Sequence, residues 1–231
     1  MSGVYRRPTM PADDLAPVTL ETAWPLFGLR IRTARLVLRL ATDDDLVALV
    51  ALARQGIHPP DEMPFGIAWT RAPSPAFERG FLQYWWANRS GWSPEDWELN
   101  LTVLLDGTPV GTQSLHARRF SSMRTVDTGS WVGAAYQRRG YGTEMRAAVL
   151  AFAFDHLAAE AAETEAYLDN AGSRGVSKTL GYASNGVGRI APEGVARETE
   201  RFLMTAERWR SVPRPAIEVH GLDACRDLFG G

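Results

Sequence analysis

This 231-residue sequence contains a single cysteine and only four histidines. One cysteine, Cys225, cannot form an internal disulfide, which excludes a disulfide-stabilised scaffold and favours a reducing compartment. His58 and His116 do not show the spacing of metal ligands, so no metal site is expected. The simplest interpretation of Cys225 is a thiol without a function of its own.

Net charge and long hydrophobic runs are also missing. The 25 basic and 27 acidic residues leave a net charge of -2, too small to attract nucleic acid or an anionic membrane from a distance. The longest apolar run, 147–154, is far shorter than the roughly 20 residues that span a bilayer. We therefore expect a cytoplasmic protein with no nucleic-acid partner and no membrane partner.

Composition and periodicity divide the chain into three segments. Residues 1–24 are rich in proline and polar side chains and have no periodicity, which predicts a mobile N-terminal arm. Residues 25–210 carry the strand and helix patterns of one domain. Residues 211–231 remain as a C-terminal tail.

The patterns within 25–210 predict a mixed α/β domain. Leucines at 36, 38 and 40 alternate as in a strand, and Thr42 before three aspartates is typical of a helix start. Two alternating runs flank Asp106-Gly107, which predicts a hairpin. Other strands are expected at 125–134, 164–169 and 200–205, and helices after Ser74-Pro75, at 141–157 and at 172–180. The expected fold is one α/β (α+β) domain with a mixed, mostly antiparallel central sheet and one strand-to-helix crossover.

The crossover carries the stretch QRRGYGT, residues 137–143. A helix N-terminus offers unpaired N–H groups and the positive end of its dipole, so it readily binds phosphate. Gly140 and Gly142 let the backbone approach an anion, and Arg138 and Arg139 add positive charge. An ordinary strand–helix connection could look the same. The stretch matches neither the P-loop nor the dinucleotide-binding pattern, which argues against nucleotide hydrolysis and dinucleotide binding.

Two longer stretches resemble the GCN5-related N-acetyltransferase (GNAT) superfamily. The string DTGSWVGAAYQRRGYGTEM, residues 127–145, resembles its acyl-CoA-binding motif, whose core is [Q/R]-x-x-G-x-[G/A]. Residues 170–182 resemble the N-x-x-S-x-x-v-x-K-x-x-G-[F/Y] motif of the RimJ/RimL-like branch, and LRIRTARLVLR is similar to the family's opening strand. The resemblance covers about residues 29–209. It implies a single GNAT-like domain in which two central parallel strands are splayed.

The resemblance implies that acetyl-CoA, or another acyl-CoA such as succinyl-CoA, is the co-substrate. The pantetheine arm would pair with the backbone of the strand before the crossover, and Asn170 would hold it from the next strand. Backbone amides of the glycine-bearing turn would surround the pyrophosphate. For the Trp131 side chain, core packing is an equal alternative. The expected cofactor-binding residues are Ser130, Trp131, Val132, Arg138, Arg139, Gly140, Tyr141, Gly142, Thr143 and Asn170.

Acyl transfer requires a neutral amine and a stabilised leaving sulfur. Deprotonating a lysine-like amine at pH 7 costs roughly 4 to 5 kcal/mol, against about 1 kcal/mol for an α-amino group, so a base matters most for alkyl amines. The resemblance points to Asp127 or Glu165 as that base, although each could be a solvated strand residue. Ser173 would assist the thiolate, or would only cap the helix that begins there. Many family members use a tyrosine at the position of Ser177.

The implied activity is direct transfer of an acyl group to a primary amine in a ternary complex. The acceptor could be a small molecule or a peptide or protein N-terminus, and the chain could act as a monomer or a homodimer. A non-catalytic acyl-CoA-binding module is the alternative, which Ser177 keeps open. A succinyl-CoA-using relative is another, because Arg118, Arg119 or Arg124 could pair with the extra carboxylate. A solvated basic loop is the plainer interpretation of these arginines.

Overall fold

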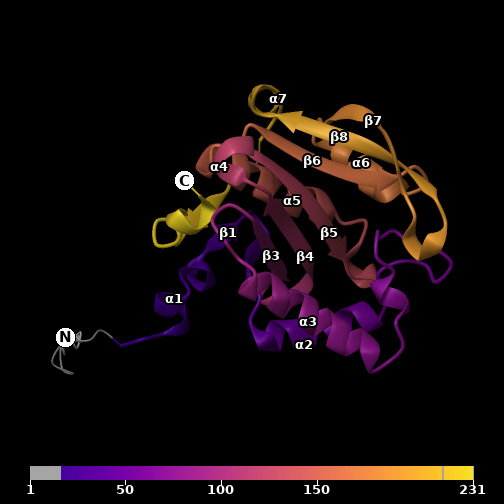
Figure 1. Ribbon diagram of the computed structural model, residues 1–231, viewed down its shortest axis with the longest axis horizontal. Coiled ribbons are helices and arrows are strands. Elements are labelled where there is room, and N and C mark those ends of the chain that lie inside the picture. Colours follow the sequence, from indigo (N-terminus) through magenta and orange to yellow (C-terminus); the bar gives the residue numbers. More distant parts are fainter. Residues whose placement is uncertain (1–16, 215, 231) are drawn as a thin grey trace, which may run out of the picture.

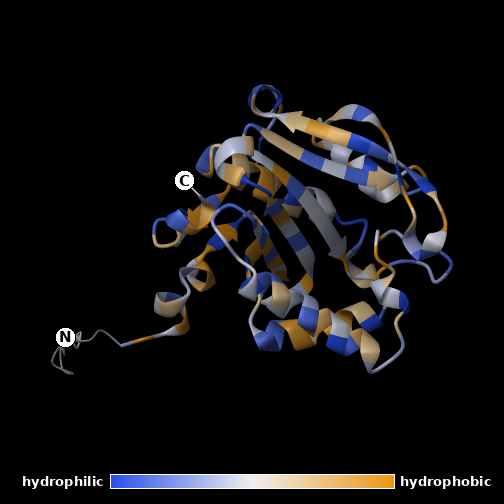
Figure 2. Cartoon of the chain, in the orientation of Figure 1, coloured by the Kyte–Doolittle hydropathy of each residue, from blue (hydrophilic) through white to orange (hydrophobic). Residues whose placement is uncertain are grey.

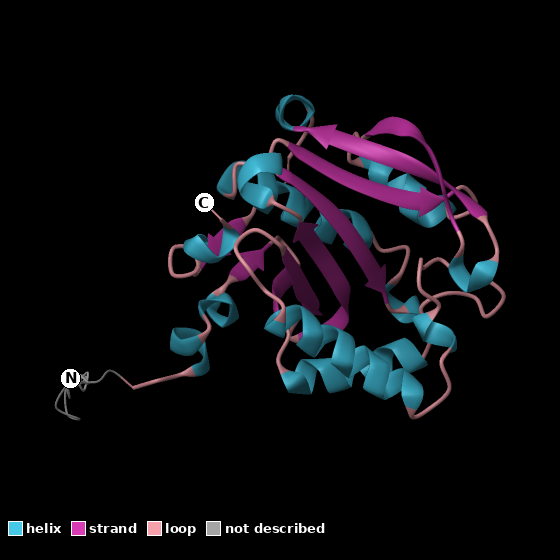
Figure 3. Cartoon of the chain, in the orientation of Figure 1, coloured by secondary structure: helices cyan, strands magenta, loops and turns pink. Residues whose placement is uncertain are grey.

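The computed structural model describes residues 17–214 and 216–230. Within them, nine strands form one sheet in the order β7-β8-β6-β5-β4-β3-β2-β1-β9. All neighbours are antiparallel except β5 and β6. Figure 3 shows the continuous sheet with helices packed around it. The predicted fold class, a mostly antiparallel sheet with one parallel crossover, is confirmed.

The element bounds are as follows. The strands are β1 (Arg30–Arg32), β2 (Leu36–Leu40), β3 (Trp97–Leu105), β4 (Thr108–Ala117), β5 (Thr125–Val132), β6 (Ala161–Tyr167), β7 (Ala183–Ile190), β8 (Arg197–Thr205) and β9 (Glu218–His220). The α-helices are α1 (Leu20–Ala23), α2 (Asp43–Arg54), α3 (Ala76–Ser90), α4 (Phe120–Met123), α5 (Tyr141–Ala151), α6 (Ala171–Thr179) and α7 (Ala206–Ser211). Short 3₁₀ or π turns are η2 (Pro25–Gly28), η3 (Trp69–Arg71), η4 (Ala134–Tyr136), η5 (Phe152–His156), η6 (Pro192–Gly194) and η7 (Arg226–Phe229).

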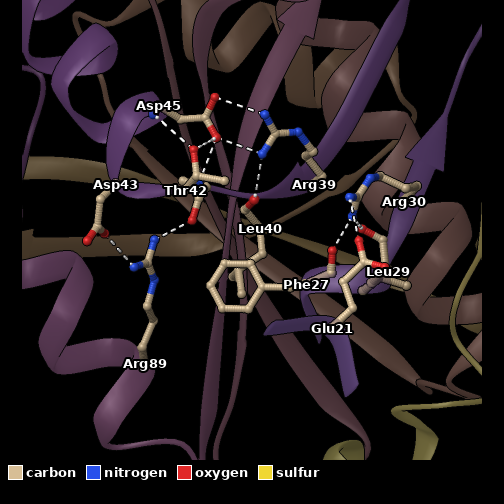
Figure 4. Close-up of polar contacts among 11 residues, drawn as sticks. Glu21, Phe27, Leu29, Arg30, Arg39, Leu40, Thr42, Asp43, Asp45 and Arg89 are labelled. Carbon is tan, nitrogen blue, oxygen red and sulfur yellow. Dashed lines mark hydrogen bonds and ion pairs between the residues drawn. The ribbon is translucent and has the colours of Figure 1, made fainter. Parts of the chain in front are cut away.

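Helix α2 begins where the sequence predicts. The Thr42 side chain accepts a hydrogen bond from the backbone N–H of Asp45, and Asp45 accepts one from the backbone N–H of Thr42, which forms a reciprocal cap. Both Asp45 carboxylate oxygens also bind the Arg39 guanidinium, at 2.6 and 2.9 Å. Figure 4 shows how this cluster ties the end of β2 to the start of α2, next to the Asp43–Arg89 ion pair. The cap therefore fixes the direction in which α2 leaves the sheet.

The predicted hairpin joins β3 to β4. Asp106 and Gly107 both have positive φ, 48° and 79°, which is the backbone of a two-residue type I′ turn. The turn sets the register in which β4 lies between β3 and β5. As a result, residues of β4 stand directly opposite residues of β5 at the centre of the sheet.

Two hydrophobic clusters stabilise the fold. The larger one joins α5 to leucines and valines of β2, β3 and β4, and the smaller one joins α2 and α3. Helix α5 is buried along nearly its whole length, in agreement with its apolar sequence. In Figure 1, α2 and α3 lie side by side along the lower edge, and in Figure 2 both carry hydrophobic and hydrophilic residues, as expected for helices with one buried face.

The chain ends add elements that periodicity does not predict. Of the expected N-terminal arm, residues 1–16 lie outside the described part, and α1 forms within the remainder. In the expected C-terminal tail, β9 pairs with β1, and Cys225 and Phe229 are buried in the larger cluster. Strand β7, rich in glycine, serine and asparagine, is a further addition. Across residues 17–214 and 216–230, no helix is both long and apolar enough to cross a membrane.

Candidate active site

Strands β5 and β6 share only a short stretch of parallel pairing. Their register runs from Thr125 opposite Ala161 to Asp127 opposite Glu163 and stops there. Beyond this point β5 continues to Val132 paired only with β4, and β6 continues to Tyr167 paired only with β8. Figure 1 shows the two strands running apart from their common start near α4. Within the described residues, the backbone edge of residues 128–132 thus lacks a strand neighbour on the β6 side.

Side chains replace the ladder at the point of divergence. The Thr164 hydroxyl donates to the carbonyl oxygen of Thr128 at 3.1 Å, and the Thr128 hydroxyl lies 3.4 Å from the carbonyl oxygen of Glu163. Strands β5 and β6 thus form a fork, which is narrow where they pair at residues 125–127 and 161–163 and widens toward Val132 and Tyr167. These contacts close its narrow end. A ligand with backbone-like donors and acceptors could pair with the open edge beyond it, as an extra strand does.

The wide end of the fork leads to the turn before α5. Arg138 and Gly140 have positive φ, 63° and 83°, and Gly140 stands at the N-cap of α5 without a side-chain cap. Residues 137–140 are exposed, and the first N–H groups of the helix, those of residues 141–143, have no hydrogen-bond acceptor within the described residues. Neither Arg138 nor Arg139 lies within 4.0 Å of a carboxylate in the described part of the chain. The turn is therefore a basic site with free backbone donors.

A third arginine, which the sequence patterns do not indicate, supports this turn. The Arg35 guanidinium pairs with the Glu144 carboxylate in the first turn of α5, donates to the carbonyl oxygen of Arg139 at 3.2 Å and lies 4.6 Å from the Tyr141 ring centroid. Arg35 comes from the loop before β2. A residue about 100 positions earlier in the chain therefore holds the backbone of the turn in place.

The segment 56–75, between α2 and α3, bridges the two sides of the fork. On the β5 side, Gln137 donates to the carbonyl oxygens of Ile57 and Val132, at 2.6 and 2.8 Å. On the β6 side, the hydroxyl of Tyr167 donates to the carbonyl oxygen of Phe65 at 3.2 Å. Arg71 and Glu193 form an ion pair at 2.7 Å between the segment and η6. The loop therefore spans the fork near its wide end.

Aromatic side chains from this loop pack on β5. The ring centroid of Trp69 lies 6.1 Å from that of Trp131, 5.6 Å from that of Phe81 and 5.3 Å from that of Phe65. The Trp131 side chain thus joins the cluster under α2 and α3, while its backbone belongs to the open edge of β5. A cavity of about 420 Å³ adjoins the cluster. It is lined by α2, the loop and the start of α3, and no residue of β5 or β6 lines it.

Polar side chains form a row across the narrow end of the fork. Glu98, His116, Asp127 and Glu163 occupy directly opposite positions on β3, β4, β5 and β6, so they share one face of the sheet. The Nε2 atom of His116 lies 3.4 Å from an Asp127 carboxylate oxygen, and both side chains are partly exposed. The row places Asp127, an expected base, next to a histidine that sequence reasoning considered only as a metal ligand. The sequence alone does not indicate that His116 lies next to Asp127, because this depends on the register between β4 and β5.

At the Glu98 end of the row, Tyr84 of α3 donates its hydroxyl to the Glu98 carboxylate. Although the Tyr84 side chain is partly exposed, desolvation of its hydroxyl and the nearby Glu98 charge raise the pKa of Tyr84 above its usual value. The phenol therefore stays protonated and holds Glu98 in place as a hydrogen-bond donor.

The other expected site residues lie on β6 and α6. Glu165 is exposed on the same face as Asp127, and it accepts a hydrogen bond from the Thr199 hydroxyl at 3.2 Å. Asn170 is the N-cap of α6, and its side-chain oxygen accepts from the backbone N–H of Ser173 at 3.0 Å. The alternative role of Ser173 as the helix cap is therefore wrong, because Asn170 fills it. Ser177, in the next turn, is fully buried.

Helix α6 packs against α5 and β6. Ser173 is thus on the α5 side of the sheet, whereas Asp127 and Glu165 face the opposite side. The basic segment containing Arg118, Arg119 and Arg124 flanks α4 at the start of β5, and the Arg124 guanidinium lies 5.2 Å from the Phe120 ring centroid. In the described part of the chain, no group of three or more His, Cys, Asp or Glu side chains could hold a metal ion.

Comparisons with known proteins agree with this geometry. The family model described as an acetyltransferase (GNAT) domain matches residues 35–183. A GCN5-related N-acetyltransferase from Brucella melitensis is 21% identical with a TM-score of 0.61, over 78% of this chain and 80% of that one. Mycobacterium smegmatis RimJ, solved in complex with CoA-disulfide, is 20% identical with a TM-score of 0.60, over 87% and 92% of the two chains. RimL, a ribosomal alpha-N-protein acetyltransferase solved with coenzyme A, is 13% identical with a TM-score of 0.59, over 75% and 95%. At these identities the likeness to the solved structures is one of fold.

Proposed function

The chain belongs to the acetyltransferase (GNAT) family, and from that premise we propose that it transfers an acetyl or related acyl group from acyl-CoA to a primary amine. The single observation that carries the proposal is the fork, in which β5 and β6 pair over three positions and then separate beside a basic helix N-terminus. The open edge and the exposed amides match the two parts of coenzyme A, an amide-bearing arm and a pyrophosphate.

The residues of the fork fit acyl-CoA on the chemistry of their donors. The backbone of Ser130, Trp131 and Val132 would hold the pantetheine arm, and Asn170 would reach it from the β6 side with the amide nitrogen that its capping role leaves free. Amides from Arg138 to Thr143 would bind the pyrophosphate, helped by the unpaired guanidinium groups of the turn. The acyl group would then reach the narrow end, next to the polar row.

The polar row is suited to removing a proton from the acceptor amine. Its carboxylates attract an ammonium group, and Asp127 with His116 offers a proton acceptor at the last paired position of β5. Glu165 is the second candidate base, two residues beyond Glu163 on the same face. We assign Asp127 the stronger claim because the histidine neighbour can pass the proton on. Ser173 would act from α6, near the sulfur.

The proposal also covers the kind of amine that accepts the acyl group, and it is based on the similarity of fold to RimJ and RimL. RimJ and RimL share this fold, and RimL is named as an alpha-N-protein acetyltransferase. We propose membership of the RimJ/RimL-like branch and an acceptor that is a peptide or protein N-terminus or a small amine. An α-amino group needs little help from a base, so such an acceptor tolerates a partly exposed carboxylate.

Two glycines of the turn allow a matched test of the donor site. Gly140→Glu adds bulk and negative charge where the phosphates approach, and at a φ of +83° any side chain is strained, so we expect CoA affinity to be lost. Gly142→Ala is the control, because its added Cβ meets only Val176 at an ordinary 3.7 Å. Calorimetry with CoA and release of free thiol from acetyl-CoA with a panel of amines measure binding and turnover. Equal CoA affinity in both variants would refute the site, and binding without thiol release would point to a binding module.

A further inference from the structure

A buried polar cluster lies beneath the fork, on the α5 side of the sheet. It consists of Thr128 of β5, Thr164 of β6, Arg146 of α5 and Tyr182, all nine-tenths or more buried. The guanidinium of Arg146 donates to the Ser130 hydroxyl at 3.0 Å and to the Thr164 hydroxyl at 3.2 Å. One side chain therefore joins the two strands just beyond the point where their pairing ends.

Arg146 has no carboxylate partner within residues 17–214 and 216–230. Its side chain is 4% exposed, no acidic group in the described part of the chain pairs with it, and its Nε atom is buried without an acceptor. Within the described residues the Tyr182 hydroxyl beside it also has no partner at strict hydrogen-bond geometry, although Arg146 and Thr128 both lie within hydrogen-bonding reach of it. A buried cation without a counter-charge is costly, so the site is incomplete unless a ligand supplies negative charge.

The position of the cluster identifies that ligand. Thr128 and Thr164 directly follow Asp127 and Glu163, the last paired residues, so the guanidinium lies at the narrow end of the fork. If the proposed function is correct, the pyrophosphate of acyl-CoA lies at the opposite, wide end. The thioester at the far end of the pantetheine arm then reaches the narrow end.

We propose that Arg146 stabilises the sulfur of coenzyme A as it leaves as a thiolate, with Tyr182 as a second hydrogen-bond donor to the same atom. This inference rests on the proposed function. It supplies a donor to the leaving sulfur, which Ser177 does not, because serine occupies the position where many family members have a tyrosine. The ligand class is thus a thiolate, held by a guanidinium and a phenol.

The bonds and protons balance without another reactant. The amine nitrogen attacks the carbonyl carbon, a C–N bond forms, and the C–S bond breaks with its electron pair left on sulfur. The amine proton passes to the polar row on the opposite face. Burial raises the pKa of Tyr182, which the charge of Arg146 only partly offsets, so the phenol donates a hydrogen bond and keeps its proton. The thiolate therefore leaves unprotonated; the polar row returns the amine proton to solvent, and the sulfur takes one proton from solvent on release, so none is gained or lost.

The acidity of bound CoA tests the proposal directly. The ultraviolet absorbance of the thiolate reports the pKa of the CoA thiol when the protein is saturated with CoA. Guanidinium groups lower the pKa of neighbouring thiols, so we expect a pKa about one unit or more below that of free CoA in the wild type and a return toward the free value in Arg146→Met. Arg210→Met, which removes an exposed arginine of α7, is the control and should keep the full shift. Cys225 does not interfere, since burial raises the pKa of its thiol to about 11.

Turnover gives a second measurement. Arg146→Met should lower kcat with acetyl-CoA by about 10²-fold, as loss of a transition-state donor does, while Arg146→Lys retains the charge and part of both the rate and the pKa shift. An unshifted thiol pKa in wild-type protein that binds and turns over acetyl-CoA would overturn this inference and leave the proposed function intact. Absence of CoA binding would overturn both. If Arg146→Met loses only succinyl-CoA turnover and keeps the thiol shift, Arg146 binds an acyl carboxylate and the thiolate assignment is wrong.

Discussion

Replacing Arg146 by methionine should make the folded protein more stable while it slows the proposed reaction. Removal of one member of a buried ion pair is destabilising because it leaves the other charge unpaired. Arg146 already lacks a counter-charge among the described residues, so its removal leaves no such charge behind. Methionine fills most of the same volume and has no polar atom to satisfy, so little cavity is created.

The magnitude follows from the contacts of the guanidinium. Its desolvation costs several kcal/mol, about 5 kcal/mol for a guanidinium buried this deeply. The two hydrogen bonds to Ser130 and Thr164 offset about 1.5 kcal/mol each. After the substitution Thr164 still donates to the Thr128 carbonyl oxygen, and partly exposed Ser130 can bind water. We therefore expect the free energy of unfolding to rise by about 2 kcal/mol.

Urea denaturation at pH 7 without ligand measures this change. With an m-value of about 3 kcal/mol/M, the midpoint should rise by about 0.7 M. Arg146→Lys is the matched comparison, because lysine keeps the buried charge but cannot bridge two hydroxyls with a planar fork, so its midpoint should fall. A midpoint that falls in Arg146→Met as far as in Arg146→Lys would refute the reasoning and make Arg146 a structural brace between β5 and β6.

Three other side chains give measurable outcomes. Burial raises the pKa of Asp45, but hydrogen bonds from Thr42 and Arg39 outweigh this effect and leave the pKa lowered. The wild type should therefore be more stable than Asp45→Asn above about pH 4 and should lose that advantage as the pH falls. Urea unfolding at several pH values measures the difference. Cys225 should resist iodoacetamide in the native state and react after unfolding. Phe229→Ala should lower the unfolding free energy by about 3 to 5 kcal/mol in denaturant titrations, because the ring is buried.

Local signals predicted the elements that local chemistry determines. Thr42 caps α2, Asp106-Gly107 forms the hairpin turn, and QRRGYGT marks the crossover, because each depends on residues a few positions apart. Strand β7 was not predicted, since most of its residues are exposed and it is held by pairing with β8. Strand β9 was not predicted either, because it is only three residues long and its partner β1 lies about 190 positions earlier in the chain.

The site was predicted where a motif carries it and missed where register or packing does. The basic turn and Asn170 follow from the family resemblance, and their roles stay proposals. His116 meets Asp127 only because the hairpin sets the register of β4 on β5. Arg146 lies within the apolar pattern of α5, and a helix buried on all sides must also bury its one internal arginine. That consequence could have been drawn from the sequence, because Arg146 directly precedes the apolar run 147–154 in the same helix.

The alternation of β5 separates the two halves of the proposed reaction. Asp127 points to the α2 and α3 face, whereas Thr128 and Ser130 point to the α5 face, where Arg146 lies. An acyl group held in the plane of the fork would thus have a proton acceptor on one side and a cation on the other. Because the sheet keeps the two apart, the carboxylate does not neutralise the guanidinium before the substrate arrives. The same geometry explains why Arg146 lacks a counter-charge in the described part of the chain: the acidic residues of the row face away from it.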